Sequence, residues 1–273
     1  MPRGKVWKAR RLVLGLVAAV GMALPLGRVA RAADVPQIAA ASDLQFALEE
    51  IIAGFAAETG REVRATYGSS GNFYTQIRQG APFQMFMSAD MALIGRLHDE
   101  GLTTDRGRPY AIGRVVLFAP KGSDLVAEAA ADDPLAGLRA ALAAGQVTRF
   151  AIANPDHAPY GRAAAEVLRG QGLWAALEPK LVLGENVAQA AQFASSGAAQ
   201  GGIFAYSLAL SPQMGALGEH VLLPAEWHAP LLQGMAVMKG ADEATRAFYD
   251  YVQQPAAREI FRRHGFVLPG ETN

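Results

Sequence analysis

Short apolar runs alternate along the chain with segments whose apolar residues recur at helical spacing, and this alternation limits the possible folds most sharply. The run at 35–41, for example, is followed by a stripe from Leu44 to Phe55, and Gly60 ends that helix. Strand-length runs that precede helical patterns indicate parallel, doubly wound sheets. The predicted strands lie at 35–41, 62–67, 82–87, 150–153, 180–183 and 202–205.

Two segments break this alternation and divide the predicted fold into lobes. Residues 110–120 form a longer β-rich stretch that suits a crossing into a second lobe, and residues 224–237 suit the return. We therefore expect an α/β protein of two lobes, each a mostly parallel sheet flanked by helices, with the ligand in the cleft between them. The predicted lobe I comprises residues 33–115 and 229–273, and lobe II comprises residues 116–228.

The first 32 residues have the pattern of a secretory signal peptide. A basic start precedes the apolar run 12–26, and Ala30-Arg31-Ala32 fits a small-x-small cleavage pattern, so cleavage is expected near Ala32. The alternative, a membrane anchor, needs about 20 apolar residues, which is longer than this run. Arg10-Arg11 leaves twin-arginine export open beside the general secretory route. The expected location is the periplasm.

Composition excludes several classes of function. The chain has no cysteine, which rules out thiol nucleophiles, iron–sulfur clusters and thiolate zinc sites. Its formal net charge is zero, and no basic patch typical of nucleic-acid binding is visible. The five histidines are scattered without metal-ligand spacing. Neither a cofactor nor a resident metal is predicted.

Four strand-to-helix loops suit a small anion. The first N–H groups of a helix have no partner within the helix, and the helix dipole makes that end locally positive. Such an end binds anions without a cationic side chain. Because two of the loops fall in each predicted lobe, together they would surround an oxyanion in the cleft. The loops are 41–43, 68–71, 157–161 and 185–187.

Each loop also has a structural interpretation. Ser42 followed by Gln45 fits a capping box, and Ser69-Ser70 fits a simple turn. Tyr160 and Val187 could be packing residues. The segment 68–71 resembles a nucleophile elbow but misses the G-x-S-x-G spacing by one residue, which leaves a Ser70-dependent hydrolase with His157 as an alternative.

The loops, taken with several flanking motifs, resemble the periplasmic molybdate-binding proteins of ABC importers. The resemblance covers essentially all of the chain after the leader, in order. It rests on the segments 39–44 (AAASDL), 67–71 (YGSSG), 80–90 (GAPFQMFMSAD), 110–114 (YAIGR), 153–161 (ANPDHAPYG), 185–187 (ENV) and 247–266.

This resemblance implies a class II periplasmic binding protein that captures molybdate or tungstate and delivers it to a membrane permease. It implies no catalysis, and we expect a monomer. The oxyanion contacts would be the Ser42 hydroxyl, the Asp43 N–H, Ser70, Tyr160 and Val187, and no side chain would bind the metal directly. Ser69 and Tyr206 are weaker candidates, because Tyr206 lies one residue beyond the position where one branch of the family has a tyrosine.

Asp43 departs from this picture, because it places a carboxylate beside an anion site. We expect its side chain to turn away or to cap backbone N–H groups. If it faced the ligand it would take up a proton and favour a protonated anion such as hydrogen phosphate. The same fold with sulfate or phosphate as its ligand is therefore the alternative function.

Overall fold

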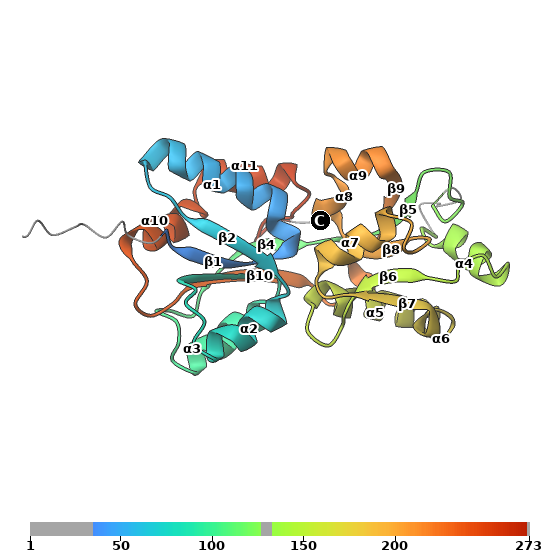
Figure 1. Ribbon diagram of the computed structural model, residues 1–273, viewed down its shortest axis with the longest axis horizontal. Helices are drawn as coiled ribbons and strands as arrows, with labels where there is room; N and C mark the ends of the chain where they lie inside the picture. The colour runs from blue at the N-terminus through green and yellow to red at the C-terminus, as the bar shows by residue number, and fades with distance from the viewer. Residues whose placement is uncertain (1–34, 127–132, 272–273) are drawn as a thin grey trace, which may run out of the picture. The chain divides into compact units, whose positions relative to one another are not determined.

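The computed structural model describes residues 35–126 and 133–271, and it contains two five-stranded sheets (Figure 1). The predicted leader, residues 1–32, lies outside the described residues. The strands of the first sheet are, in spatial order, β2 (Arg64–Gly68), β1 (Gln37–Ala41), β3 (Met85–Ser88), β10 (Leu231–Val237) and β4 (Arg108–Gly113). Those of the second are β7 (Leu181–Gly184), β6 (Phe150–Ala153), β8 (Gly202–Ala205), β5 (Val115–Pro120) and β9 (Gly218–Leu222).

Both sheets are mixed rather than purely parallel. In the first sheet, β1 pairs in parallel with β2 and β3, whereas β10 runs antiparallel to β3 and β4. In the second, β6 pairs in parallel with β7 and β8, whereas β5 runs antiparallel to β8 and β9. The antiparallel strands β5 and β10 are the ones that the chain enters after crossing from the other sheet.

Alternating residues of the first sheet serve two separate cores. Ile38 and Ala40 pack with α1 (Gln45–Thr59), α10 (Glu243–Tyr251) and α11 (Pro255–Arg263). Ala39, between them, packs on the opposite side with α2 (Ser70–Arg78) and α3 (Met91–Asp99). This is the period of two that a strand imposes on its side chains. The sheet is therefore covered by helices on both faces (Figure 1).

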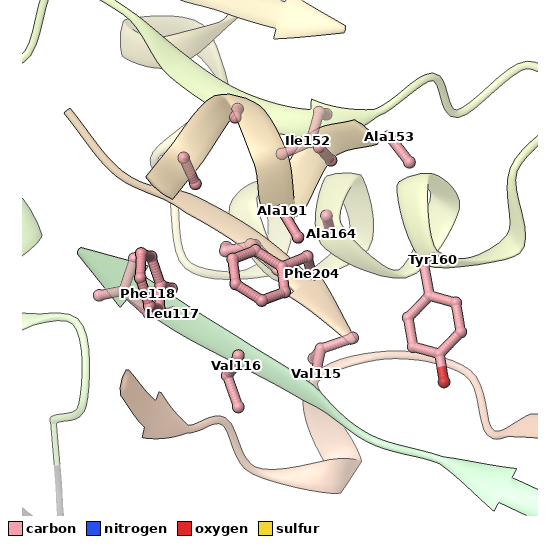
Figure 2. Close-up of a cluster of buried hydrophobic side chains, with 14 of the residues drawn as sticks. Val115, Val116, Leu117, Phe118, Ile152, Ala153, Tyr160, Ala164, Ala191 and Phe204 are labelled. Atoms are coloured by element: carbon pink, nitrogen blue, oxygen red, sulfur yellow. The ribbon is translucent and has the colours of Figure 1, made fainter. Parts of the chain in front are cut away.

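The second sheet has a larger apolar core, in which Val116, Phe118 and Phe204 are fully buried (Figure 2). The helices α5 (Pro159–Gly170) and α7 (Val187–Ser195) pack against β6 and β8. The remaining helical elements are η1 (Ser42–Leu44), α4 (Ala136–Ala143), α6 (Trp174–Leu177), η2 (Glu178–Lys180), α8 (Tyr206–Ala209), α9 (Pro212–Leu217) and η3 (Ala225–Trp227).

The predicted two-lobed α/β fold is confirmed, and the strands at 150–153 and 202–205 have the predicted bounds. The β-rich stretch 110–120 divides at Arg114 into β4 and β5, which belong to different sheets. The return occurs between β9 and β10. The exact lobe boundaries, at 115/116 and 228/229, stay a prediction. Among residues 35–126 and 133–271, none of the helices has both the length and the apolar character that membrane crossing requires.

Helix α5 offers a test of the close packing behind the cleft. A Cβ atom on Gly161 would lie 2.2 Å from the carbonyl oxygen of Ala153, whereas one on Gly170 of the same helix would meet nothing within 4 Å. We expect Gly161→Ala to lower the free energy of unfolding by about 1–3 kcal/mol, because it forces backbone apart. Gly170→Ala, the matched control, should change it by no more than about 0.5 kcal/mol. Urea unfolding measures both, and equal effects would contradict this account.

Candidate functional site

One cavity is lined by the starts of four helical segments that follow strands of both sheets. It lies where β1 leads into η1, β2 into α2, β7 into α7, and the loop after β6 into α5. The free space inside the cavity is about 10 Å³, which is roughly the room that one water needs. The predicted residues that line it are Ser42, Asp43, Ser69, Ser70, Tyr160 and Val187.

The cavity wall combines small apolar residues with hydroxyl groups and the Asp43 carboxyl group, and it carries no basic side chain among the residues that the structure describes. Arg162, one turn into α5, is directed instead to Asp90, and its Nη2 lies 2.6 Å from the carboxylate oxygen Oδ2. Hydroxyl groups and helix-start N–H groups are therefore the donors that the wall offers to an anion.

Ser42 joins the two lobes rather than capping its own helix. Its Oγ donates to Oδ1 of Asn186 (3.1 Å) and accepts from the N–H of Ala188 (3.3 Å). The capping-box prediction for Ser42 and Gln45 is wrong, because neither η1 nor α1 has a side-chain cap. The helix start of η1 is thereby left free of a local acceptor, while Asn186 caps α7 by accepting from Gln189 N–H at 3.0 Å.

The two serines of the second loop have different partners. Ser70 Oγ accepts from the N–H of Ala89 at 3.0 Å, within the first lobe. Ser69 Oγ donates to the carbonyl oxygen of His157 at 2.7 Å, in the second lobe. The N–H of Gly71 donates to the same carbonyl, and a Cβ on Gly71 would lie 2.4 Å from it. Gly71 thus permits close approach of the two lobes.

The hydrolase alternative requires Ser70 beside His157, and the structure pairs this histidine with Ser69 instead. The Nδ1 atom of His157 lies 3.0 Å from Ser69 Oγ, whose proton is already directed to the His157 carbonyl. Within the described part of the chain, no hydrogen bond joins Ser70 to His157. In the same part, no group of three or more histidine, aspartate or glutamate side chains is arranged to hold a metal ion.

Asp43 lies at the centre of a buried polar network that spans both lobes. Its Oδ2 accepts from Tyr160 Oη (2.9 Å) and from Gln233 Nε2 (2.6 Å). Gln233 Oε1 in turn accepts from Tyr110 Oη at 2.7 Å. These side chains come from η1, α5, β10 and β4. Figure 2 shows Tyr160 beside the apolar core, with its hydroxyl oxygen directed away from the aliphatic side chains.

The environment of Asp43 disfavours a charged carboxylate. Burial raises its pKa to about 6, and the hydrogen bonds from Gln233 and Tyr160 only partly oppose this effect. Its second oxygen, Oδ1, is buried and has no hydrogen-bond partner in the described part of the chain. The side-chain hydrogen bonds of the Asp43 carboxylate come from residues far away in the chain, Tyr160 and Gln233, and the only backbone group that acts on it among the described residues is its own. The carboxylate therefore does not cap the start of a following helix, as one expectation had it.

Close packing around this network depends on Gly113 at the end of β4. A Cβ atom there would lie 2.1 Å from Tyr160 Oη and 2.9 Å from Gln233 Nε2. Both are donors to Asp43. Any side chain at position 113 would therefore displace the two groups that hold the carboxylate.

Tyr206 is placed apart from the other predicted residues. Its ring centroid lies 5.6 Å from that of His220, and it borders Gly265. It is not among the residues that line the cavity. Its neighbour Ser207 contributes instead, because the Ser207 hydroxyl donates to the carbonyl oxygen of Asp43 at 2.8 Å.

A family model for bacterial extracellular solute-binding proteins matches residues 36–267. The chain belongs to this family. The molybdate-binding protein ModA of Rhodobacter capsulatus is 38% identical to this solute-binding protein, over 91% of this chain and 95% of its own. ModA of Azotobacter vinelandii is 36% identical, over 93% of this chain and 97% of its own.

A solved structure supports the same relationship. The periplasmic molybdate-binding protein of Azotobacter vinelandii superposes with a TM-score of 0.75 and 32% identity, covering 86% of this chain and 99% of that one. The resemblance to molybdate-binding proteins that the sequence motifs indicate is thus confirmed for this solute-binding protein.

Sequence reasoning assigned no role to three residues that shape the site, although two of them lie in motifs that carry the family resemblance. The Ser42 hydroxyl donates to Asn186, and Gln233 donates to Asp43. Tyr110 donates in turn to Gln233. A signal for Gln233 existed, because it is the one polar side chain in the otherwise apolar strand β10 and is fully buried. A buried polar residue of this kind needs a hydrogen-bond partner.

The raised pKa of Asp43 predicts how the stability of this solute-binding protein depends on pH. The folded protein binds more protons than the unfolded chain between the ordinary value of 3.8 and about 6, so stability falls as pH rises through this window. Across the whole window the free energy of unfolding falls by about 3 kcal/mol. Asp43→Asn should abolish this pH dependence, so the variant becomes more stable relative to the wild type as the pH rises from 4 to 7.

Urea unfolding at several pH values measures this difference. Asp156→Asn is the matched control, because Asp156 is exposed and its carboxylate is not taken out of water. The raised pKa of Asp43 would be contradicted if the difference in unfolding free energy between the wild type and Asp43→Asn stayed constant from pH 4 to pH 7.

Proposed function

We propose that this protein captures a tetrahedral molybdate or tungstate anion between its two lobes and delivers it to the membrane permease of an ABC importer. The observation that carries the proposal is a cavity formed by helix starts from both sheets, whose wall has no basic side chain among the residues that the structure describes. Membership of the solute-binding family and the molybdate-binding relatives support the choice of anion.

The proposed contacts are those expected from the motifs. Ser42 and Ser70 supply hydroxyl groups, and the helix-start N–H groups of Asp43, Tyr160 and Val187 complete a neutral shell. Tyr160 contributes its N–H because its hydroxyl donates to Asp43. Ser69 is a weaker candidate, as the motifs imply, and Tyr206 is weaker still because it does not line the cavity and its ring lies near His220. The molybdenum atom itself is bound by no side chain.

Entry of an anion requires the lobes to separate, because a tetrahedral oxyanion is larger than the water-sized space in the cavity. The contacts that must part include Ser42 with Asn186, Ser69 with the His157 carbonyl, and Asn72 with Glu185 at 2.5 Å. We propose a hinge at the two crossings, with lobe I at 33–115 and 229–273 and lobe II at 116–228. Hinge closure around a ligand is a common motion in binding proteins.

The proposed setting is the periplasm, after removal of residues 1–32, where the protein acts as a monomer. It needs no cofactor. Docking of the closed protein on the permease would release the anion into the transport path.

Calorimetric titration of the purified protein tests the choice of anion. We expect molybdate and tungstate to bind with affinities of the same order, and sulfate and phosphate to bind far more weakly. The reason is that a buried donor left without an acceptor by a smaller or protonated anion costs about 1–3 kcal/mol. Sulfate that binds as tightly as molybdate would overturn the proposal.

The same titration with variants tests the proposed contacts. Ser42→Ala and Ser70→Ala should each weaken molybdate binding by about 10- to 100-fold, since a hydrogen bond to a charged group contributes about 1.5–3 kcal/mol. Ser196→Ala, at the exposed C-terminal end of α7, is the control and should leave the affinity unchanged. Unchanged affinity in both Ser42→Ala and Ser70→Ala would show that the site is assigned wrongly.

We further propose that the protein catalyses no reaction. A serine-reactive fluorophosphonate probe should label neither Ser69 nor Ser70, and an activated ester should not be turned over above the buffer rate. The physical reason is that both hydroxyl groups are buried and bonded to backbone groups. Stoichiometric labelling of either serine would revive the hydrolase alternative.

A further inference from the structure

The carboxyl group of Asp43 is fully buried in the wall of the cavity, and none of the residues that the structure describes gives it a cationic partner. The groups that act on it are Gln233, Tyr160 and its own backbone. Every salt bridge found among residues 35–126 and 133–271 involves other carboxylates, such as that of Asp90 with Arg162. A buried carboxylate that lacks a cation is held in its charged form only at a cost in free energy.

Few ionisable groups face Asp43 from the elements packed around it. Tyr160 on α5 and Tyr110 on β4 do so, and the pKa of each is raised first by burial and then by Asp43. The strand β10 and the helix α7 carry no ionisable side chain. The other ionisable groups nearby make no bond to Asp43 among the residues that the structure describes. The Tyr67 hydroxyl on β2 is buried without a hydrogen-bond partner, and the Tyr206 ring on α8 lies near His220. Arg114 donates through Nη2 to the Leu223 carbonyl.

The two oxygens of the carboxyl group differ in a way that indicates where a proton would reside. Oδ2 accepts from both Tyr160 and Gln233, whereas Oδ1 is buried without a partner. A proton on Oδ1 leaves both hydrogen bonds to Oδ2 in place. It also removes the negative charge from a site that water does not reach.

A dianion in the cavity would strengthen this preference, because Asp43 is one of the residues that line it. Two like charges in a low-dielectric interior repel each other far more than in water, and a nearby negative charge favours the protonated form of a carboxyl group. The wall supplies no cation that would offset the repulsion.

We infer that Asp43 becomes protonated when the cleft closes on a dianion, so that each anion captured from neutral solution takes up one proton. This inference rests on the proposed function. The proton comes from the solvent, an O–H bond forms at Oδ1, and no other covalent bond changes. The occupied site then holds one negative charge less than the sum of the anion and the ionised side chain.

Proton uptake makes affinity depend on pH. Because the pKa of Asp43 without ligand is about 6, the free protein is mostly ionised above that pH, whereas the complex stays protonated. The affinity for molybdate should therefore fall about tenfold for each unit of pH between 7 and 8. Molybdate is fully deprotonated in this range, so the ligand itself does not contribute.

Calorimetry at pH 7.5 in buffers of different ionisation enthalpy counts the protons taken up per molybdate bound. We expect about one for the wild-type protein and near zero for Asp43→Asn. His157→Gln, which removes the histidine next to Ser69 at the cleft, should keep the count near one. Should Asp43→Asn not fold, the carbon-13 shift of the Asp43 carboxyl group with and without molybdate reports the same protonation.

The outcomes separate this inference from the proposed function. Molybdate binding with a proton count near zero in wild type overturns the inference and leaves the function intact. A count near one that persists in Asp43→Asn also overturns it, because the proton then goes to another group. The absence of any molybdate binding overturns the proposed function, and this inference with it.

Discussion

The direction of the strands is the constraint on which the rest of the structure depends. The strands β1, β2, β6 and β7 all end at the same cavity, and the helix that follows each one must begin there. A helix start has unpaired N–H groups and a positive dipole end, so the fold itself concentrates donors at one point. Among the residues that the structure describes, the wall contains no lysine or arginine, and its donors are neutral groups whose positions are set by packing.

The same constraint explains why both sheets contain one strand of opposite direction. The strands that end at the cavity point toward the other lobe. A segment that arrives from that lobe must therefore run away from the cavity, and β5 and β10 do so. Sequence patterns alone indicated mostly parallel sheets, because apolar runs in parallel and central antiparallel strands look alike. The crossing points were nevertheless predictable, since the β-rich stretch 110–120 is too long for one strand of the series.

Local signals located the loops of the site but could not supply its partners. The alternation of strand and helix placed Ser42, Ser70, Tyr160 and Val187 at helix starts, and the structure brings them to one cavity. The partners of Ser42 and of its neighbour Asp43 are more than a hundred positions away in the chain, at Asn186 and Gln233. Ser42 met every local requirement for a helix cap, yet its hydroxyl bonds across the cleft instead. Such competition between near and distant acceptors is decided by tertiary packing, which no sequence window contains.

Gly113 limits which residues this site can have, although it is not among the residues that line the cavity. The hydroxyl of Tyr160 and the amide of Gln233 occupy the space that any side chain at 113 would fill. In related chains, a residue larger than glycine at this position should occur only together with changes at both partners. Covariation of these three positions among relatives would therefore trace which lineages retain a carboxyl group held in this manner, and which have replaced the arrangement as a unit.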